Sequence, residues 1–399
     1  MTKNKNIYIL MYKNYEVFTF LVDFRRSKAT FLEKLDHFDK APYGFNNVDA
    51  DLDKELRFFL NTRQIPPQRR GYKEILKATH SRNGFNLSFK GHGLSLSNHY
   101  WYKRSDENLS YEKINFFTNK WDDSFARALL KEDYEALNNV DLNVPDIVTA
   151  GWGVKGWLYD ANKGPRLYKL GIHAGNSEEA LCEVLASRLA QRMFKKEDVL
   201  QYDLETIYGK YASVSSPIIS LEEDLIPLSN YLSFEMNNLY RSVKNNKNAY
   251  NEFLAKLKSD GYIELVTFFI KLSCLKTICF VSDLHFGNIS MVKNMNTNQI
   301  RVAPIYDLGG SFGSSNTAKE HLKHPSTVTL LLIYYLYYNL DPEWDYSWYN
   351  KDRLVGFEDE IKEVLTKSSF YTPEIMEFII QIYHQQKETL DEMSGKNRN

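Results

Sequence analysis

Apolar and polar residues alternate along parts of the first half of the chain, and this alternation predicts strands. Residues 7–21 carry β-branched and aromatic side chains on both sides of Lys13-Asn14, so we expect a hairpin that turns at these two residues. Gly91–Trp101 alternates in the same way and predicts a half-buried strand with an aromatic end. A further strand is predicted for Arg166–Leu170.

Helical spacing is clearest between residues 176 and 193. Asn176 is suited to cap this helix, and Glu179, three residues later, completes a capping box. Glu183 lies almost opposite the apolar face of the predicted helix, beside small residues, so another group can approach it closely. The apolar face itself consists of Leu181, Val184, Leu185, Leu189 and Met193.

From about residue 227 onwards the chain is expected to be mostly helical. Its long apolar segments are Ile263–Leu275 and Val328–Leu340. The second is about two thirds of the roughly 20 residues that a membrane span requires, and it contains four tyrosines, so we interpret it as a buried helix. The fold class is therefore predicted to be α+β, with an N-terminal part at 1–148, a middle part at 149–226 and a C-terminal part at 227–399.

Charge and cysteine content restrict the partners and the compartment. Lys and Arg total 50 against 51 Asp and Glu, so the chain lacks the basic surplus that drives duplex binding, and we expect no direct contact with nucleic acid. The three cysteines have no metal-type spacing, as expected where thiols stay reduced. The apolar run at residues 7–12 is too short for a secretory signal. We therefore expect a cytoplasmic protein without a membrane partner.

The residues best suited to chemistry surround a second predicted hairpin, formed by Ile289–Val292 and Ile300–Ala303. Asp283 and Asn288 come just before this hairpin, and Asp307 comes just after it. Because the outer ends of a hairpin meet, we expect these three side chains to lie within a few ångströms of one another. Carboxylate and amide oxygens are ligands that suit Mg²⁺.

Phosphoryl transfer requires such a cluster, because its catalysis is mostly positioning and neutralisation of charge on the phosphates. The spacing between Asp283 and Asn288 equals that between the catalytic Asp and the metal-binding Asn of protein-kinase catalytic loops. Asp307-Leu308-Gly309 is similar to the metal-binding Asp-Phe-Gly of those enzymes. His285, two residues after the first Asp, makes the pattern more specific.

Together these motifs resemble the catalytic core of the HipA-like family of bacterial serine/threonine kinases, of the Gram-positive type. The family's Asp-x-His-x-x-Asn is present as Asp283, His285 and Asn288, and its Ala-Pro-x-Tyr-Asp is present at residues 303–307. The resemblance implies that Asp283 is the catalytic base and that Asn288 and Asp307 bind Mg²⁺. For His285, we favour a role in tying the catalytic loop to the core over proton transfer.

The resemblance extends upstream to a nucleotide site. Residues 151–156 are similar to the family's phosphate loop, whose residues here are Gly151, Gly153, Lys155 and Gly156. Lys169 matches the strand lysine that holds nucleotide phosphates, and Glu183 matches the helix glutamate that pairs with this lysine. Without a Cβ, the glycines let backbone N–H groups approach phosphates. Taken alone, the glycines would also suit a plain turn, Lys169 an exposed strand position and Glu183 a helix surface.

This resemblance implies a two-lobed protein-kinase-like fold with an N-terminal mixed α/β accessory region, a nucleotide-binding N-lobe and a mostly helical C-lobe. It also implies transfer of phosphate from ATP, with Mg²⁺, to a protein Ser or Thr hydroxyl, and an antitoxin partner. Two alternatives stay open. One is a small-molecule phosphotransferase of the aminoglycoside or choline type, and the other is a catalytically idle pseudokinase that binds an antitoxin.

A group of basic residues in the N-terminal part is interpreted as a solvated charged face, with an anion or acidic-peptide site as the alternative. The group consists of Arg63, Arg69, Arg70, Lys73 and Lys77.

Overall fold

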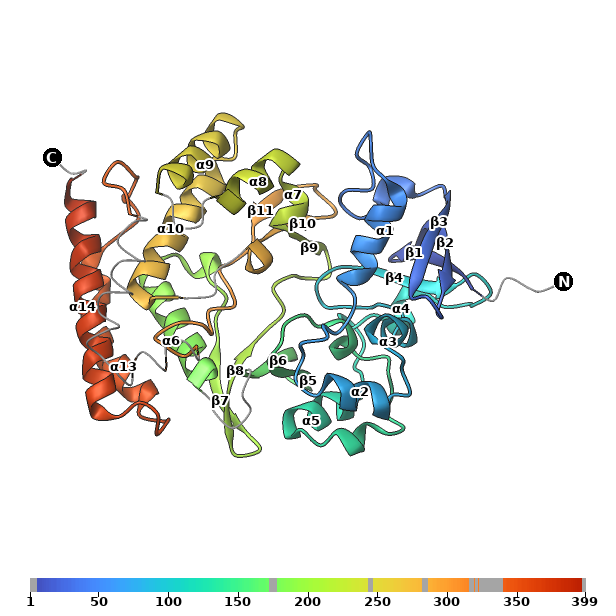
Figure 1. The fold of residues 1–399 in the computed structure, drawn as a ribbon, viewed down its shortest axis with the longest axis horizontal. Coiled ribbons are helices and arrows are strands. Elements are labelled where there is room, and N and C mark those ends of the chain that lie inside the picture. Colours follow the sequence, from blue (N-terminus) through green and yellow to red (C-terminus); the bar gives the residue numbers. More distant parts are fainter. Residues whose placement is uncertain are drawn as a thin grey trace. The chain divides into compact units, whose positions relative to one another are not determined.

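The computed structural model describes residues 6–171, 178–242, 247–281, 286–315, 319, 322 and 340–396. The chain forms two compact units (Figure 1). The first unit comprises residues 1–174, 216–225 and 294–297, and the second comprises residues 175–215, 226–293 and 298–399. Both units contain strands and helices, so the predicted α+β class is confirmed. The division at residues 148 and 226 stays a prediction.

The first unit combines a four-stranded antiparallel sheet, of order β3-β2-β1-β4, with a further antiparallel hairpin and short helices. Its strands are β1 (Ile7–Tyr12), β2 (Tyr15–Asp23), β3 (Lys28–Lys34), β4 (Tyr100–Arg104), β5 (Val154–Asp160) and β6 (Gly164–Gly171). Its α-helices are α1 (Leu52–Asn61), α2 (Tyr72–Ala78), α3 (Gly84–Lys90), α4 (Tyr111–Ile114) and α5 (Ser124–Lys131), and its 3₁₀ helices are η1 (Phe38–Lys40), η2 (Tyr134–Leu137) and η3 (Pro145–Val148).

The alternation in β1 explains how its sheet is packed, because successive side chains point to opposite faces. Tyr8, Leu10 and Tyr12 enter one apolar core, whereas Ile9 and Met11 enter another. Both faces of the sheet are therefore covered. The predicted turn at Lys13-Asn14 is confirmed, since it joins β1 to β2 in one antiparallel pair.

The second unit is mostly helical around one large core, which α6, α10, α13 and α14 share. Its α-helices are α6 (Glu178–Met193), α7 (Leu228–Tyr231), α8 (Phe234–Ser242), α9 (Lys247–Ser259), α10 (Ile263–Cys279), α13 (Phe357–Leu365) and α14 (Pro373–Lys396). Its strands are β7 (Asp203–Ile207), β8 (Lys210–Ser215), β10 (Ser290–Asn294) and β11 (Ile300–Val302), and β9 (Glu223–Pro227) spans a boundary between the units. Its 3₁₀ helices are η4 (Lys196–Asp198), η5 (Phe286–Asn288) and η6 (Lys351–Leu354).

Several predicted elements are confirmed in the described ranges. The Arg166–Leu170 strand lies within β6, the Ile263–Leu275 helix lies within α10, and the second hairpin is formed by β10 and β11. The apolar face predicted for α6 is buried. The three cysteines are free thiols in the core.

The strand predicted for Gly91–Trp101 is wrong except at its end. Residues 91–99 form turns, and the strand β4 begins only at Tyr100. His92 and Gly93 both have positive φ, of +54° and +64°, which an extended strand does not allow. Leu94 and Leu96 are nevertheless buried, so the alternation reflects a loop that inserts side chains into the core.

Other predictions fall on parts of the chain that lie outside the described residues. These are the capping residue Asn176, all but the last residue of the Val328–Leu340 segment, and the catalytic-motif residues Asp283 and His285. None of the helices in the described ranges is both long and apolar enough to cross a membrane.

Candidate active site

The glycine loop, residues 149–153, lies between η3 and β5 in the first unit. Side-chain hydrogen bonds fix its start. The Trp157 N–H donates to Asp146 Oδ1 at 2.9 Å, and Trp157 Nε1 donates to Thr149 Oγ1 at 3.1 Å. Thr149 Oγ1 donates in turn to Pro145 O at 2.9 Å. The loop therefore leaves η3 from a fixed point beside β5.

Arg69 holds the backbone of the glycine loop from one side. Its guanidinium donates to the carbonyl oxygens of residues 149, 150 and 151 at 2.6, 3.2 and 2.7 Å. The backbone N–H of the next residue, Arg70, donates to Trp152 O at 3.1 Å. Four consecutive carbonyl groups of the loop thus face Arg69 and Arg70.

The interpretation of the basic group as a solvated face is wrong for Arg63 and Arg69. Their exposed fractions are only 3% and 4%, and Arg63 also donates to two backbone carbonyls. Burial lowers the pKa of Arg69 to about 10, against the opposing effect of Asp146, so Arg69 stays charged at neutral pH. Arg70 is more exposed and forms an ion pair with Glu132. Arg63 and Arg69 are therefore structural groups, whose partners the sequence pattern does not reveal.

The amide side of the glycine loop is arranged to bind an anion. In a planar trans peptide the C=O and the following N–H point in opposite directions. Because the carbonyls of residues 149–152 face Arg69 and Arg70, the N–H groups of residues 150–153 point away from them. Within the described part of the chain these four N–H groups donate to no protein atom, and Ala150 and Trp152 are exposed. A row of backbone donors of this kind is a typical anion site.

Two lysines add positive charge beside the loop. Lys155 on β5 lies directly opposite Lys169 on β6, so both side chains are on the same face of the hairpin. The Lys155 ammonium also lies against Gly151, where a Cβ would collide with it. Like charges opposite one another in a strand pair are unfavourable.

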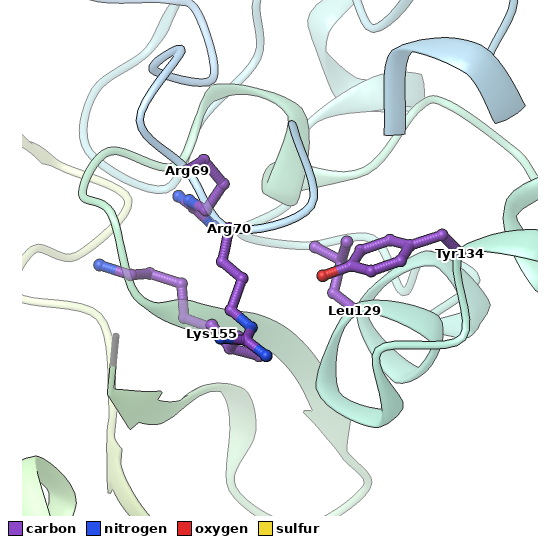
Figure 2. Close-up of a pocket in the computed structure, with 6 residues that line it drawn as sticks. Arg69, Arg70, Leu129, Tyr134 and Lys155 are labelled. Carbon is purple, nitrogen blue, oxygen red and sulfur yellow. The ribbon is translucent and has the colours of Figure 1, made fainter. Parts of the chain in front are cut away.

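A small recess adjoins Lys155 in the same unit. Figure 2 shows Arg69, Arg70 and Lys155 on one side of it, with Leu129 and Tyr134 on the other. Its volume is about 10 Å³, room for about one water molecule and far below the roughly 300 Å³ at which small-molecule pockets begin. The recess therefore does not itself hold a nucleotide.

The other two glycines of the motif differ from Gly151 in their surroundings. Gly153 lies in the loop and is buried, and its N–H is one of the four that donate to no protein atom in the described part of the chain. Gly156 lies on β5, where a Cβ would be 2.9 Å from the Cβ of Ala126 on α5. Close packing of α5 on β5 accounts for this glycine, and its role with phosphates stays a prediction.

Replacement of Gly151 by alanine is expected to weaken binding of ATP by roughly tenfold or more. Gly151 has φ +93°, where an alanine is strained, and the new Cβ would displace the Lys155 ammonium. Gly164→Ala is the matched control, because Gly164 also has positive φ, of +72°, but a Cβ there meets no atom within 4 Å. Titration of both variants with ATP tests this, and equal affinities would show that the loop geometry does not matter.

Asp146, beneath the loop, predicts a pH dependence of stability. Burial raises its pKa to about 7, from 3.8, although the Trp157 N–H and Arg69 oppose the shift. The folded state therefore keeps a proton that the unfolded state releases near pH 4, so this contribution to stability is present below pH 4 and is lost as pH rises towards 7. Asp146→Asn cannot lose the proton. Its free energy of unfolding relative to the wild type should rise between pH 4 and 8 in denaturant titrations, and a constant difference would contradict the assignment.

The β10–β11 hairpin in the second unit positions Asn288 and Asp307. The ladder continues beyond β11, because the Ala303 N–H donates to Ser290 O at 2.9 Å. The hydroxyls of Ser290 and Tyr306 lie 2.9 Å apart and join the two ends of the hairpin. Asn288 precedes Ser290 by two residues and Asp307 directly follows Tyr306, so both come from the joined ends, and the convergence of their side chains with Asp283 stays a prediction.

The backbone at Asp307 has a specific conformation. Its φ is +61°, in the left-handed region, which Asp and Asn tolerate better than most residues. The Asp307 N–H donates to the buried Tyr202 hydroxyl at 3.2 Å. The following residue, Leu308, is fully buried in the core. These contacts fix the direction in which the chain leaves the hairpin.

Glu183 on α6 is buried, with 1% of its surface exposed, so the alternative of a helix-surface glutamate is wrong. It accepts a hydrogen bond of 2.5 Å from Ser213 Oγ on β8. The backbone carbonyl oxygen of the neighbouring residue Cys182 accepts a 3.0 Å hydrogen bond from Ser311 Oγ, four residues after Asp307. Within the second unit, α6 is therefore attached to the segment that follows Asp307.

The described residues include part of the predicted metal site. Asn288 and Asp307 offer an amide and a carboxylate oxygen, which fit Mg²⁺ in chemistry, and the third predicted group, Asp283, is outside the described ranges. Among the described residues no group of three or more His, Cys, Asp or Glu is placed to hold a metal ion. The pairing of Lys169 with Glu183 stays a prediction, because the two residues belong to different units.

Comparison with known proteins gives structural neighbours but no sequence relatives. No protein-family model matches the chain, and no curated protein matches it either. Its fold is similar to the Helicobacter pylori proinflammatory kinase CtkA, at 15% identity and a TM-score of 0.43, over 61% of this chain and 93% of the other. It is also similar to a chain of the Shewanella oneidensis MR-1 complex of the toxin–antitoxin proteins HipA and HipB with operator DNA. That match has 10% identity and a TM-score of 0.49, over 97% and 99% of the two chains.

Proposed function

We propose that this chain is a kinase that transfers the γ-phosphate of ATP, with Mg²⁺, to a serine or threonine hydroxyl of a protein. The observation that carries the proposal is the row of four backbone donors at residues 150–153 beside the Lys155 ammonium. Such a row suits the oxygens of a polyphosphate. The reaction type comes from the motif at Asp283, Asn288 and Asp307, which resembles that of the HipA-like kinases.

In this mechanism the loop amides bind phosphate oxygens, while Lys155 and Lys169 offset their charge. Asp283 accepts the proton of the acceptor hydroxyl as its oxygen bonds to the γ-phosphorus and the bond to the leaving ADP breaks. Asn288 and Asp307 would hold Mg²⁺, which would supply positive charge to offset that of the phosphates.

Glu183 has a supporting role in the proposal. A buried carboxylate is costly unless it is paired, and Ser213 provides one hydrogen bond to Glu183. From the resemblance of both positions to the family's motif, we propose that Glu183 pairs with Lys169, whose ammonium would then be oriented towards the α- and β-phosphates. The attachment of α6 to the segment after Asp307 would keep the lysine's partner and the metal ligand in one arrangement.

The acceptor is tested by incubating the purified protein with γ-labelled ATP, Mg²⁺ and a cell lysate. The proposal predicts label on serine or threonine of a protein band and no transfer by Asp283→Ala. Label on a small alcohol would instead identify a small-molecule kinase, and ATP binding without any transfer would identify a pseudokinase scaffold. If the chain acts as the toxin of a toxin–antitoxin pair, its expression should arrest growth and Asp283→Ala should relieve the arrest.

A further inference from the structure

The segment that contains Arg69 belongs to the N-terminal part of the chain, to which sequence analysis assigns no chemistry. We infer that Arg69 is a positioning residue of the nucleotide site, which turns the amide side of the glycine loop towards the phosphates. The inference rests on the proposed function and assigns the N-terminal part a role in it.

The geometry of the contact is specific to an arginine. Three carbonyl groups in a row accept from Nε and Nη2 of one planar guanidinium. A lysine ammonium has no planar fork, and its donors diverge from one point, so it cannot reproduce this pattern. Because peptide planarity couples each carbonyl to the next N–H, fixing the carbonyls of residues 149–151 also fixes the direction of the N–H groups of residues 150–152.

Arg69 is itself held in place. It follows Pro66-Pro67, its N–H donates to Pro66 O at 2.8 Å, and its carbonyl accepts from the Tyr72 N–H at 3.0 Å at the start of α2. With 4% of its surface exposed, its side chain is enclosed by protein. A rigid support of this kind prepares the loop before ligand binds, and preorganised donors bind a charged ligand more tightly than donors that must first be oriented.

The test compares Arg69→Lys with Arg57→Lys, which makes the same chemical change at an exposed position on α1. Arg69→Lys keeps the charge but loses the planar fork of donors. We expect Arg69→Lys to weaken binding of tripolyphosphate and of ATP by roughly 10- to 100-fold, while adenosine binds as it does to the wild type. Arg57→Lys should match the wild type for all three ligands.

The outcomes separate the inference from the proposed function. If the wild type binds neither ATP nor tripolyphosphate, both fail. If the wild type binds them and Arg69→Lys binds them equally well, the inference alone is overturned. An equal loss of affinity for adenosine would indicate general structural damage and would also overturn the positioning role.

Hydrogen exchange on the wild type gives a second test that does not depend on the folding of a variant. The amides of residues 150–152 should exchange rapidly without ligand and slow by at least about tenfold when tripolyphosphate is added. Slow exchange without ligand, or no change on its addition, would show that these donors do not face the phosphates.

Discussion

Asp307→Asn should reduce the rate of phosphate transfer by at least about 10²- to 10³-fold, the usual effect of removing one preorganised electrostatic group. The substitution removes one negative charge from the predicted Mg²⁺ site and leaves an amide oxygen of the same shape. Asn tolerates the φ of +61° at this position, and the backbone N–H can still donate to Tyr202. The loss should therefore come from metal binding and not from unfolding.

The matched control is Asp359→Asn, which makes the same chemical change at an exposed position on α13. Both variants should melt within a few degrees of the wild type. Transfer of labelled phosphate is then measured across a range of Mg²⁺ concentrations. Asp307→Asn should need more Mg²⁺ for whatever rate remains, and a rate and Mg²⁺ dependence equal to those of the control would remove Asp307 from the mechanism.

Lys169→Met is expected to weaken ATP binding by roughly 10- to 100-fold, because a hydrogen bond to a charged group contributes about 1.5–3 kcal/mol. Lys169 shares a face of the β5–β6 hairpin with Lys155, so we expect the two ammonium groups to act on the same ligand. Methionine keeps much of the length and the apolar stem of the lysine but removes its charge. Adenosine, which has no phosphate, should bind with unchanged affinity.

Lys163→Met serves as the control for this prediction. Lys163 lies in the exposed turn between the same two strands, away from the paired lysines. The salt dependence gives a further check, because ATP binding by the wild type should weaken with added salt more steeply than binding by Lys169→Met. If Lys169→Met binds ATP as tightly as the wild type and the Lys163→Met control do, the hairpin is not part of the nucleotide site.

Local patterns predicted the elements that depend mainly on local sequence. In both predicted hairpins, a short polar segment connects two β-rich runs, and the structure contains both: β1–β2, which turns at Lys13-Asn14, and β10–β11. The apolar stripe of α6 was also found correctly. The sequence did not show that Glu183, on the other side of α6, is buried. Its burial depends on β8 and on the segment after Asp307, which lie far from α6 in the sequence.

The wrong or missing predictions share a physical cause. Backbone conformation and hydrogen bonds to backbone carbonyls leave little trace in the pattern of side chains. Residues 91–99 alternate like a strand, but two left-handed residues fold them into turns. Arg69 looks like one member of a charged surface, yet its partners are carbonyl groups 80 to 82 residues away, which no side-chain pattern marks. Tyr202, which holds the Asp307 backbone, was missed for the same reason.

The central claim is that this chain binds the polyphosphate of a nucleotide through the glycine loop and two lysines, with Mg²⁺ held by Asn288 and Asp307. Calorimetric titration of the full chain with ATP, once with Mg²⁺ and once with a chelator, tests it most directly. The account predicts saturable binding of one ATP per chain that is tighter with Mg²⁺. An absence of binding under both conditions, or an affinity that does not depend on Mg²⁺, would contradict it.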